Sequence, residues 1–445
     1  MTDSPIRPFD VTHRGVLAIA VPMTFAYLST PLVGVVNLGA VGRLGDPALV
    51  GGVAIGAVLF DAVFAAFNFL RAGTTGFVAQ AYGAGDQREV AATFHRALIL
   101  AVGIGLAVVL AAGPLLAGGL VLVGGSDAVQ AATADYWHVR VLATPFALAN
   151  YVVLGWLIGV GRAGYGLLLQ TVLNGINAVL SVAFVGALDL GVAGVGWASF
   201  AAEVATAAFG IVLVARLTDR SARPGRAAIF DGRAFRRMIA VNRDIMIRSL
   251  TLTFAYGFFA SRSAAAGDVV LAANQILLNL TMVGSFFLDG LAAAAEQLAG
   301  RAVGARYRPA FVRTLRLAAG WGLVIGAAMT AVFLLAGGVL VDLMTTSEAV
   351  RAATRDLLFL AALLPLAGAL AYQMDGIFIG ATWSADMRNM MLLSLAVFLA
   401  VYAALTPLLG IAGLWIAFLV FNGARGGTLW WRAWKRIPGA FPAER

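Results

Sequence analysis

The stretch SDAVQAAT at residues 126–133 returns as SEAVRAAT at residues 347–354, 221 positions further along a chain of 445 residues. Four matches in the same order indicate that the chain is a duplication of one unit. The three others lie at an offset of 221 or 219: YVVLGWLIG at 151–159 with YQMDGIFIG at 372–380, LLAGG at 115 and at 334, and GVAGVGWA at 191 with GIAGLWIA at 410.

The composition excludes a water-soluble fold. Hydrophobic residues make up 61% of the chain and charged residues 12%, against roughly 45–50% and about 25% in soluble domains. Apolar runs follow one another from Gly15 to Trp434, each of the roughly 20 residues or more that cross a membrane. The first run lacks a signal-peptide cleavage site, so we expect it to stay in the mature chain. We predict an all-α integral membrane protein with twelve transmembrane helices, at 15–38, 51–79, 94–118, 134–160, 166–187, 191–215, 245–266, 269–299, 313–337, 355–380, 389–409 and 411–434.

Arginine is abundant in every second loop between the predicted spans and scarce in the loops between those. The side that carries the N-terminus holds most of it, including eight arginines between residues 216 and 243. By the positive-inside rule, both termini are cytoplasmic, which requires an even number of spans. The net charge of +9 then sets topology and contacts anionic lipid headgroups rather than nucleic acid. The opposite side offers only Arg43, Arg140, Arg262, Arg351 and Arg355.

The duplication predicts the domain organisation. Six spans per half place both halves in the membrane in the same direction, as parallel repeats around a central cleft suited to alternating access. The predicted parts are a cytoplasmic tail at 1–14, an N-lobe at 15–215, a basic cytoplasmic linker at 216–243, a C-lobe at 244–434 and a second cytoplasmic tail at 435–445.

Local signals predict how these helices begin and pack. Ser126 and Ser347 open the repeated octets and are suited to capping helix N-termini. Small residues four positions apart let helices approach closely in lipid. Such pairs occur at Gly155 and Gly159 in the first half and at Gly376 and Gly380 in the second.

Prolines inside the spans predict bends. Because proline removes a backbone donor, it bends or ends a transmembrane helix. Pro22 and Pro31 make the first span the candidate for a bending element that gates transport. Further bends or ends are expected at Pro114, Pro145, Pro365 and Pro407.

Several chemistries are excluded by missing residues. The single lysine, Lys435, has no glycine-rich loop before it, so there is no Walker A site and any pumping must use an ion gradient. The absence of cysteine excludes disulfides and thiolate sites. No serine or threonine in the spans has a histidine to activate it. We therefore expect a transporter rather than an enzyme, without metal or organic cofactor and with H⁺ or Na⁺ as the coupling ion.

Ionisable residues within the spans are candidates for coupling. A charge inside the membrane is costly and is a functional hypothesis by default. The alternative is an ion pair or capping bond that holds helices together, for which Arg71, Arg248 and Arg425 are available. The candidates are Asp375, Asp61, Glu203, Asp289 and Glu296.

Uncharged polar and tyrosine residues form a second set. Together they suit a cavity for amphipathic organic molecules, and each serves equally well as an interhelical hydrogen-bonding group. They are Tyr27, Asn150, Tyr151, Asn174, Asn177, Tyr256, Asn274, Gln275, Asn279 and Tyr372.

Five stretches resemble the DinF branch of the multidrug and toxin extrusion (MATE) family over nearly the whole chain. The resemblance implies twelve helices in two lobes, outward-open and inward-open states, and export of cationic or amphipathic compounds against protons or sodium. It also implies a monomer in the bacterial inner membrane. The stretches are VPMTFAYLSTPLVGVVNLGAVGRLG (21–45), FLRAGTTGFVAQAYGAGD (69–86), NRDIMIRSL (242–250), FFLDGLAAAAEQLAGRAVGAR (286–306) and DGIFIGATWSADMRNMM (375–391).

Two positions depart from this family's pattern. Members of the branch carry aspartates in the first and fifth spans, where this chain has Asn37 and Ser181. Because asparagine cannot titrate, we expect coupling to have moved to Asp375, Asp61 or Glu203. Two alternatives to a drug exporter stay open: a flippase for lipids or lipid-linked glycans, and a non-transporting membrane sensor or scaffold.

Overall fold

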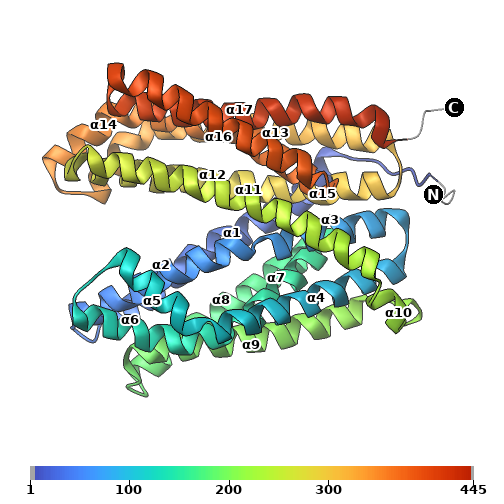
Figure 1. Ribbon diagram of the computed structural model, residues 1–445, viewed down its shortest axis with the longest axis horizontal. Coiled ribbons are helices and arrows are strands. Elements are labelled where there is room, and N and C mark those ends of the chain that lie inside the picture. The colour runs from blue at the N-terminus through green and yellow to red at the C-terminus, as the bar shows by residue number, and fades with distance from the viewer. Residues whose placement is uncertain (1–5, 442–445) are drawn as a thin grey trace. The chain divides into compact units, whose positions relative to one another are not determined.

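The computed structural model describes residues 6–441, and within that range it contains helices and no β-strand (Figure 1). The first half of the chain contains α1 (His13–Gly42), α2 (Pro47–Phe67), α3 (Phe69–Ala84), α4 (Gln87–Leu110), α5 (Ala112–Val123), α6 (Asp127–Arg140), the 3₁₀ helix η1 (Val141–Ala143), α7 (Thr144–Gly159), α8 (Ala163–Gly186) and α9 (Gly191–Leu217).

The second half begins with two short elements in the basic linker and continues with longer helices. They are η2 (Arg220–Ala222), α10 (Arg226–Ile229), α11 (Gly232–Ala265), α12 (Asp268–Gly304), α13 (Arg308–Met344), α14 (Glu348–Ala362), α15 (Leu364–Gly380), α16 (Ser384–Leu409) and α17 (Ile411–Ala440).

The helices follow the predicted spans. To within one residue at three ends, each of the twelve predicted spans falls within one helix or within helices joined by a short break. In the described part of the chain, nine helical segments are long and apolar enough to cross a membrane, and the bent pair α14–α15 makes a tenth. α11 and α17 are not among them, and both carry arginines within their length. The prediction of a multi-pass α-helical protein is confirmed, while the count of twelve stays a prediction.

Prolines mark the breaks in two helical segments at matching positions of the repeat. Pro145 lies at the start of α7, after the 3₁₀ turn η1. Pro365 lies at the start of α15, after a break at Leu363 where α14 and α15 differ in direction by 41°. α1 runs as one helix through Pro22 and Pro31, so neither proline ends it. A gating role for these two prolines stays a prediction.

The chain divides into two compact units. The C-unit comprises residues up to Thr24, Tyr82–Gly85 and the chain from Ile239 onward, and the N-unit comprises Phe25–Ala81 and Asp86–Met238. The division crosses α1 two residues after Pro22. The predicted lobe boundaries in the linker stay a prediction.

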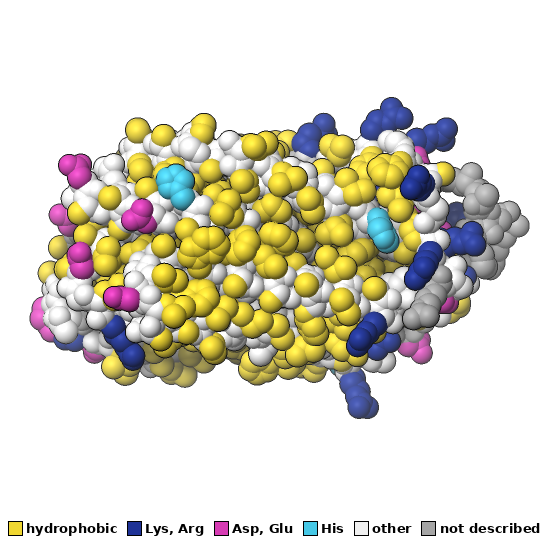
Figure 2. Space-filling model, turned by 90° about the horizontal axis from the view of Figure 1, so that it is seen from below, with side chains coloured by type: hydrophobic (Ala, Val, Ile, Leu, Met, Phe, Trp, Pro, Cys, Tyr) yellow, Lys and Arg dark blue, Asp and Glu magenta, His cyan; other side chains and the backbone are white. Residues whose placement is uncertain are grey.

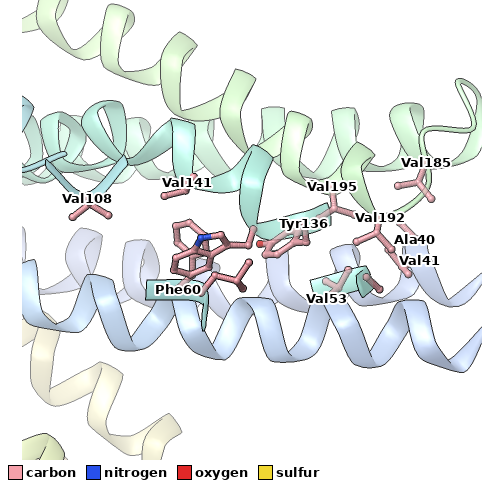
Figure 3. Packing of buried hydrophobic residues seen from close by; sticks show 13 residues of the cluster. Ala40, Val41, Val53, Phe60, Val108, Tyr136, Val141, Val185, Val192 and Val195 are labelled. Carbon is pink, nitrogen blue, oxygen red and sulfur yellow. The ribbon is translucent and has the colours of Figure 1, made fainter. Parts of the chain in front are cut away.

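Aromatic side chains fill the core of each unit. In the N-unit, Phe60 of α2 lies 4.8 Å from the ring of Trp137 on α6, beside Tyr136 (Figure 3). The Trp137 indole N–H donates to the carbonyl of Ala112 at 3.0 Å, so its polar edge is satisfied. In the C-unit, Phe259 and Trp415 lie edge to face at 4.9 Å and fix α11 against α17.

Glycines permit close helix approach in both units, as predicted. A Cβ atom at Gly155 would collide with the backbone carbonyl of Arg71 on α3. A Cβ at Gly376 would collide with the carbonyl of Ala292 on α12. The predicted packing role of these positions is confirmed.

The two repeated octets differ in their first residue's contacts. Ser126 accepts the backbone N–H of Val129 at 3.4 Å and caps α6 as predicted. Ser347 makes no such bond, so its predicted capping role is wrong. Its backbone N–H donates instead to the hydroxyl of Thr345 at 3.2 Å.

Both ends of the described chain meet the connection between α12 and α13. The backbone N–H of Arg7 donates to the carbonyl of Ala305 at 3.1 Å. The ring of Phe441 lies 5.3 Å from that of Phe311.

On the face drawn in Figure 2, hydrophobic side chains cover the middle, Asp and Glu gather at one end, and Lys and Arg at the other. A hydrophobic middle between two polar ends is the surface that a membrane-spanning protein exposes to lipid and water.

Candidate functional site

The N-unit holds a buried ion cluster at the break between α6 and α7. Arg140 is the last residue of α6, directly before η1. Its Nη2 lies 3.5 Å from Oε1 of Glu203 on α9, and Glu203 is 8% exposed. Its guanidinium also lies over the ring of Phe60, 5.0 Å from the centroid. The helix break therefore places a cation against a carboxylate inside the bundle.

Asn150 of α7 completes the surroundings of this carboxylate. Its amide Nδ2 donates to Oε2 of Glu203 at 2.7 Å and to the backbone carbonyl of Glu203 at 3.1 Å. Each oxygen of the Glu203 carboxylate thus has a different partner. Hydrogen bonds to an ionised group are stronger than neutral ones, so this pair ties α7 firmly to α9.

A second carboxylate lies within the field of the same arginine. The charge of Arg140 acts on Asp61 of α2, whose side chain is exposed in the N-unit. The charge of Arg140 also acts on Tyr136, and Tyr151 lies within the electric field of both carboxylates and of Arg71 and Arg140. We call Asp61, Arg140, Asn150 and Glu203 the Arg140 cluster. With both acids ionised, it holds two negative charges and one positive charge.

The C-unit holds a different ion cluster around Asp375 of α15. Its Oδ2 accepts from Nη1 of Arg248 on α11 and from Nη2 of Arg425 on α17, both at 2.9 Å. Asp375 is 9% exposed and Arg425 is 3% exposed. Within the described chain, Oδ1 of Asp375 makes no hydrogen bond. We call Arg248, Asp375 and Arg425 the Asp375 cluster; its cations outnumber its anion.

Two tyrosines and Asp289 lie beside the Asp375 cluster. The Tyr372 hydroxyl donates to Oγ of Ser285 at 2.9 Å and is hydrogen-bonded to Tyr256. The charges of Asp289 and Arg425 act on both tyrosines. Glu296, seven residues after Asp289 on α12, is 2% exposed. The structure thus brings Asp289 near Tyr256 and Tyr372.

The two clusters are not copies of one another. At the repeat offset of 221, Asp375 corresponds to Leu154, and at 219, Glu203 corresponds to Asn422. Asn422 accepts from Nη1 of Arg425 at 2.9 Å. The halves have therefore diverged where they carry charge, although their helices match.

The remaining predicted polar residues form hydrogen bonds between or along helices. Asn177 donates to Ser199 at 2.8 Å, and Asn274 donates to Ser263 at 2.7 Å and accepts from the Trp415 indole at 2.9 Å. These three contacts link neighbouring helices and match the structural alternative. Asn174 donates to Ser29 at 2.7 Å and Gln275 to Asn279 at 3.2 Å; Tyr27 is half-buried.

The two positions that depart from the family pattern lie in the N-unit. Ser181 is fully buried and donates to Oδ1 of Asn177 at 3.4 Å. Oδ1 of Asn37 is buried and accepts no hydrogen bond from the described residues. Neither side chain belongs to the Arg140 cluster.

Arg140 is the site residue that sequence reasoning missed. It was assigned to the loops opposite the N-terminus, although it falls inside the predicted span 134–160. The criterion that selected Asp61 and Glu203, an ionisable residue within a span, applies equally to Arg140. Ser285 and Asn422 carry no comparable signal, because small polar residues are common in transmembrane helices.

Comparisons with known proteins agree with this architecture. A family model described as MatE matches residues 22–183 and 245–411. DNA damage-inducible protein F of Escherichia coli strain K12 is 36% identical over 421 residues, 94% of this chain and 92% of that protein. A probable multidrug resistance protein NorM of Bradyrhizobium diazoefficiens is 30% identical over 375 residues, 81% of this chain and 78% of that protein. A crystal structure of MATE in complex with MaL6 superposes with a TM-score of 0.86 at 21% identity, covering 96% of each chain, which shows a common fold.

Proposed function

The chain belongs to the MatE family of multi-pass membrane transporters, and from this premise we propose that it is a proton-coupled exporter of small organic cations. It works as a monomer in the bacterial inner membrane by alternating access, with both termini in the cytoplasm. The names of its relatives, which include multidrug resistance and multidrug export proteins, support this substrate class.

The observation that carries the proposal is the excess of acid in the Arg140 cluster. Arg140 contacts Glu203 at 3.5 Å and acts on Asp61, so one guanidinium serves two carboxylates. Arg71 acts on Tyr151 in the same region, but Arg140 is the cation whose charge acts on both acids, and one guanidinium does not balance two carboxylates. A carboxylate inside a membrane needs either a cation or a proton. A proton or a cationic substrate supplies that charge, and the two compete for the same place.

Competition of this kind is the basis of exchange. When a proton neutralises the cluster from the outside, the cationic substrate loses its electrostatic partner and is released. When the proton leaves on the inner side, the cluster again attracts a cation. Each ligand shifts the protein toward the state that binds it better, as coupling requires.

The Asp375 cluster has the opposite charge balance. Two guanidinium groups share Oδ2 of Asp375 at 2.9 Å each, which supports a structural ion pair rather than a proton site. We therefore place coupling at Glu203 and Asp61 and assign Asp375 to holding α11, α15 and α17 together. Asp289, near the tyrosines of the C-unit, belongs to the substrate path in this proposal, and Glu296 to the packing of α12.

The test is uptake of ethidium into proteoliposomes under an imposed proton gradient, an imposed sodium gradient, or neither. A proton gradient is expected to accelerate uptake, and Glu203→Gln is expected to abolish the acceleration. Glu348→Gln, at an exposed carboxylate, is the matched control and keeps it. Unchanged acceleration in Glu203→Gln would contradict the coupling site. Acceleration by sodium alone would contradict proton coupling, and no uptake by folded protein would contradict the exporter.

A second candidate function is a lipid flippase, which the Asp375 cluster favours. Its surplus guanidinium charge, with Nε of Arg248 and Nε of Arg425 buried without an acceptor among the described residues, suits an anionic headgroup. Transbilayer movement of a fluorescent phosphatidylglycerol, followed by dithionite quenching, distinguishes the two. Flipping that depends on Arg425 and on no ion gradient would favour the flippase.

A further inference from the structure

A cavity of about 640 Å³ lies at one end of the N-unit, between α4, α9 and the start of the basic linker. Arg216, at the end of α9, and Arg223, just after η2, both line it. His95 and Phe94 of α4 also line it. The cavity therefore combines cationic side chains with ring side chains.

The two arginines that line the cavity are not held in place by other described residues. Arg216 and Arg223 are both exposed, and neither forms a hydrogen bond or ion pair with another described residue. By contrast, Arg140, Arg248 and Arg425 are each paired with a carboxylate. Two guanidinium groups with ten free N–H donors between them, lining one cavity, form a binding place for an anion with several oxygens.

The acidic residue in the same cavity already has its own donors. The carboxylate of Asp219 accepts the backbone N–H of Ser221 at 2.9 Å. Hydrogen bonds from Ser221 hold the pKa of the exposed Asp219 carboxyl below its usual value. Asp219 thus shapes the turn at η2, and the two arginines leave the cavity positive.

An apolar trough continues from this cavity. A second cavity of about 440 Å³ is lined almost wholly by apolar atoms, including Val102 and Leu106 of α4 and Phe146 of α7. Ile211 of α9 lines both cavities, so the two are neighbours on the N-unit. Val102, Leu106 and Ile211 are exposed in the N-unit, as side chains that face lipid are.

We propose that this pair of cavities binds one anionic phospholipid of the cytoplasmic leaflet. Arg216 and Arg223 hold the headgroup phosphate, and an acyl chain lies in the trough between α4, α7 and α9. Basic pockets at the cytoplasmic ends of transmembrane helices are suited to anionic headgroups. The bound lipid would hold the first residues of the linker against α4. Lipid binding would therefore control the conformation of the linker and would not act at the transport site.

Native mass spectrometry of the full-length protein in detergent tests the proposal, with phosphatidylglycerol and phosphatidylcholine as probes. Phosphatidylglycerol is expected to bind more tightly, and Arg216→Gln/Arg223→Gln to weaken it by about tenfold or more, at roughly fivefold per arginine. Arg233→Gln/Arg236→Gln removes the same charge from exposed arginines of the linker side and is expected to change binding less than about twofold. If both double variants lose phosphatidylglycerol binding equally, the lipid is attracted by general surface charge and not by a specific site, which would overturn the proposal.

A separate variant tests the proposed position of the acyl chain in the trough. Val102→Trp fills it without changing charge and is expected to weaken both lipids, whereas Val332→Trp, at an exposed valine of α13, leaves binding unchanged. Unaltered phosphatidylglycerol binding in Val102→Trp would overturn the acyl-chain position. Displacement of the lipid by millimolar inorganic phosphate would overturn the lipid as the occupant. All the substituted residues are exposed, and elution as a single peak in size-exclusion chromatography verifies folding of each variant.

Discussion

Asn150 donates two hydrogen bonds to Glu203, one to the carboxylate at 2.7 Å and one to the backbone carbonyl of the same residue at 3.1 Å. The amide therefore fixes both the helix α9 and the direction of its acidic side chain. A positioning role follows for Asn150, since it holds one oxygen of the carboxylate whose other oxygen contacts Arg140.

Replacing Asn150 by leucine tests this role. The change leaves Oε2 of Glu203 buried without its donor, so we expect a loss of about 1.5–3 kcal/mol in stability and several-fold slower proton-driven ethidium uptake. Thermal unfolding in detergent and proteoliposome uptake measure the two effects. Asn174→Leu, at the residue that bonds Ser29, is the control. Full uptake in Asn150→Leu would show that Glu203 needs no positioning.

Replacing Asp375 by asparagine tests the assignment of its cluster to structure. Two arginines would lose their common anion, and removal of one partner from a buried ion pair costs about 3–5 kcal/mol. We expect a marked fall in the midpoint of thermal unfolding. In Asp375→Leu/Arg425→Met, which removes both charges, a large part of the stability should return. If Asp375→Asn is as stable as the wild type and still loses proton coupling, Asp375 is a coupling residue.

Two glycines of the C-unit should respond in opposite directions to the same change. Gly376→Ala places a methyl group against the carbonyl of Ala292, and such overpacking costs about 1–3 kcal/mol. Gly423→Ala adds a methyl group where no atom lies within 4 Å, so the better helix propensity of alanine should stabilise by about 0.5–1 kcal/mol. Equal effects on the unfolding midpoint would argue against the close α12–α15 approach.

Replacing each of the two repeated serines by alanine should have a different effect on stability. Ser126→Ala removes the cap of α6 and is expected to cost about 0.5–1 kcal/mol, the low end of the usual range because the bond is long. Ser347→Ala removes a side chain that makes no capping bond and should leave the unfolding midpoint unchanged. A comparable loss in both variants would mean that Ser347 caps α14 in solution.

The helical layout was predictable because membrane spans leave a strong signal. Long apolar runs and the offset of 221 residues located the long helical segments, but not η2 and α10 of the basic linker. Local breaks at Pro145 and Pro365 were also predictable, since proline acts on its own helix. The absence of a capping bond at Ser347 was not, because Ser126 opens a nearly identical octet and does form one.

The candidate site was only partly predictable, because the sequence does not show which ionisable side chains meet in the folded protein. Asp375 and Glu203 are alike in sequence, as single acids in apolar spans. Two arginines from distant helices meet Asp375, whereas Glu203 meets one arginine and an amide. Nothing in the spacing of Arg248 and Arg425 indicates that their side chains meet on one carboxylate.

The meeting of both chain ends at the α12–α13 connection has a consequence for circular permutation. Arg7 bonds Ala305, and Phe441 packs on Phe311, six residues further along. A short linker should therefore join the old termini without disturbing either unit. New ends opened in the short stretch between η2 and α10 would put the second half of the chain first. Such a permutant would be synthesised in the order opposite to that of the natural chain, with every helix of both halves intact.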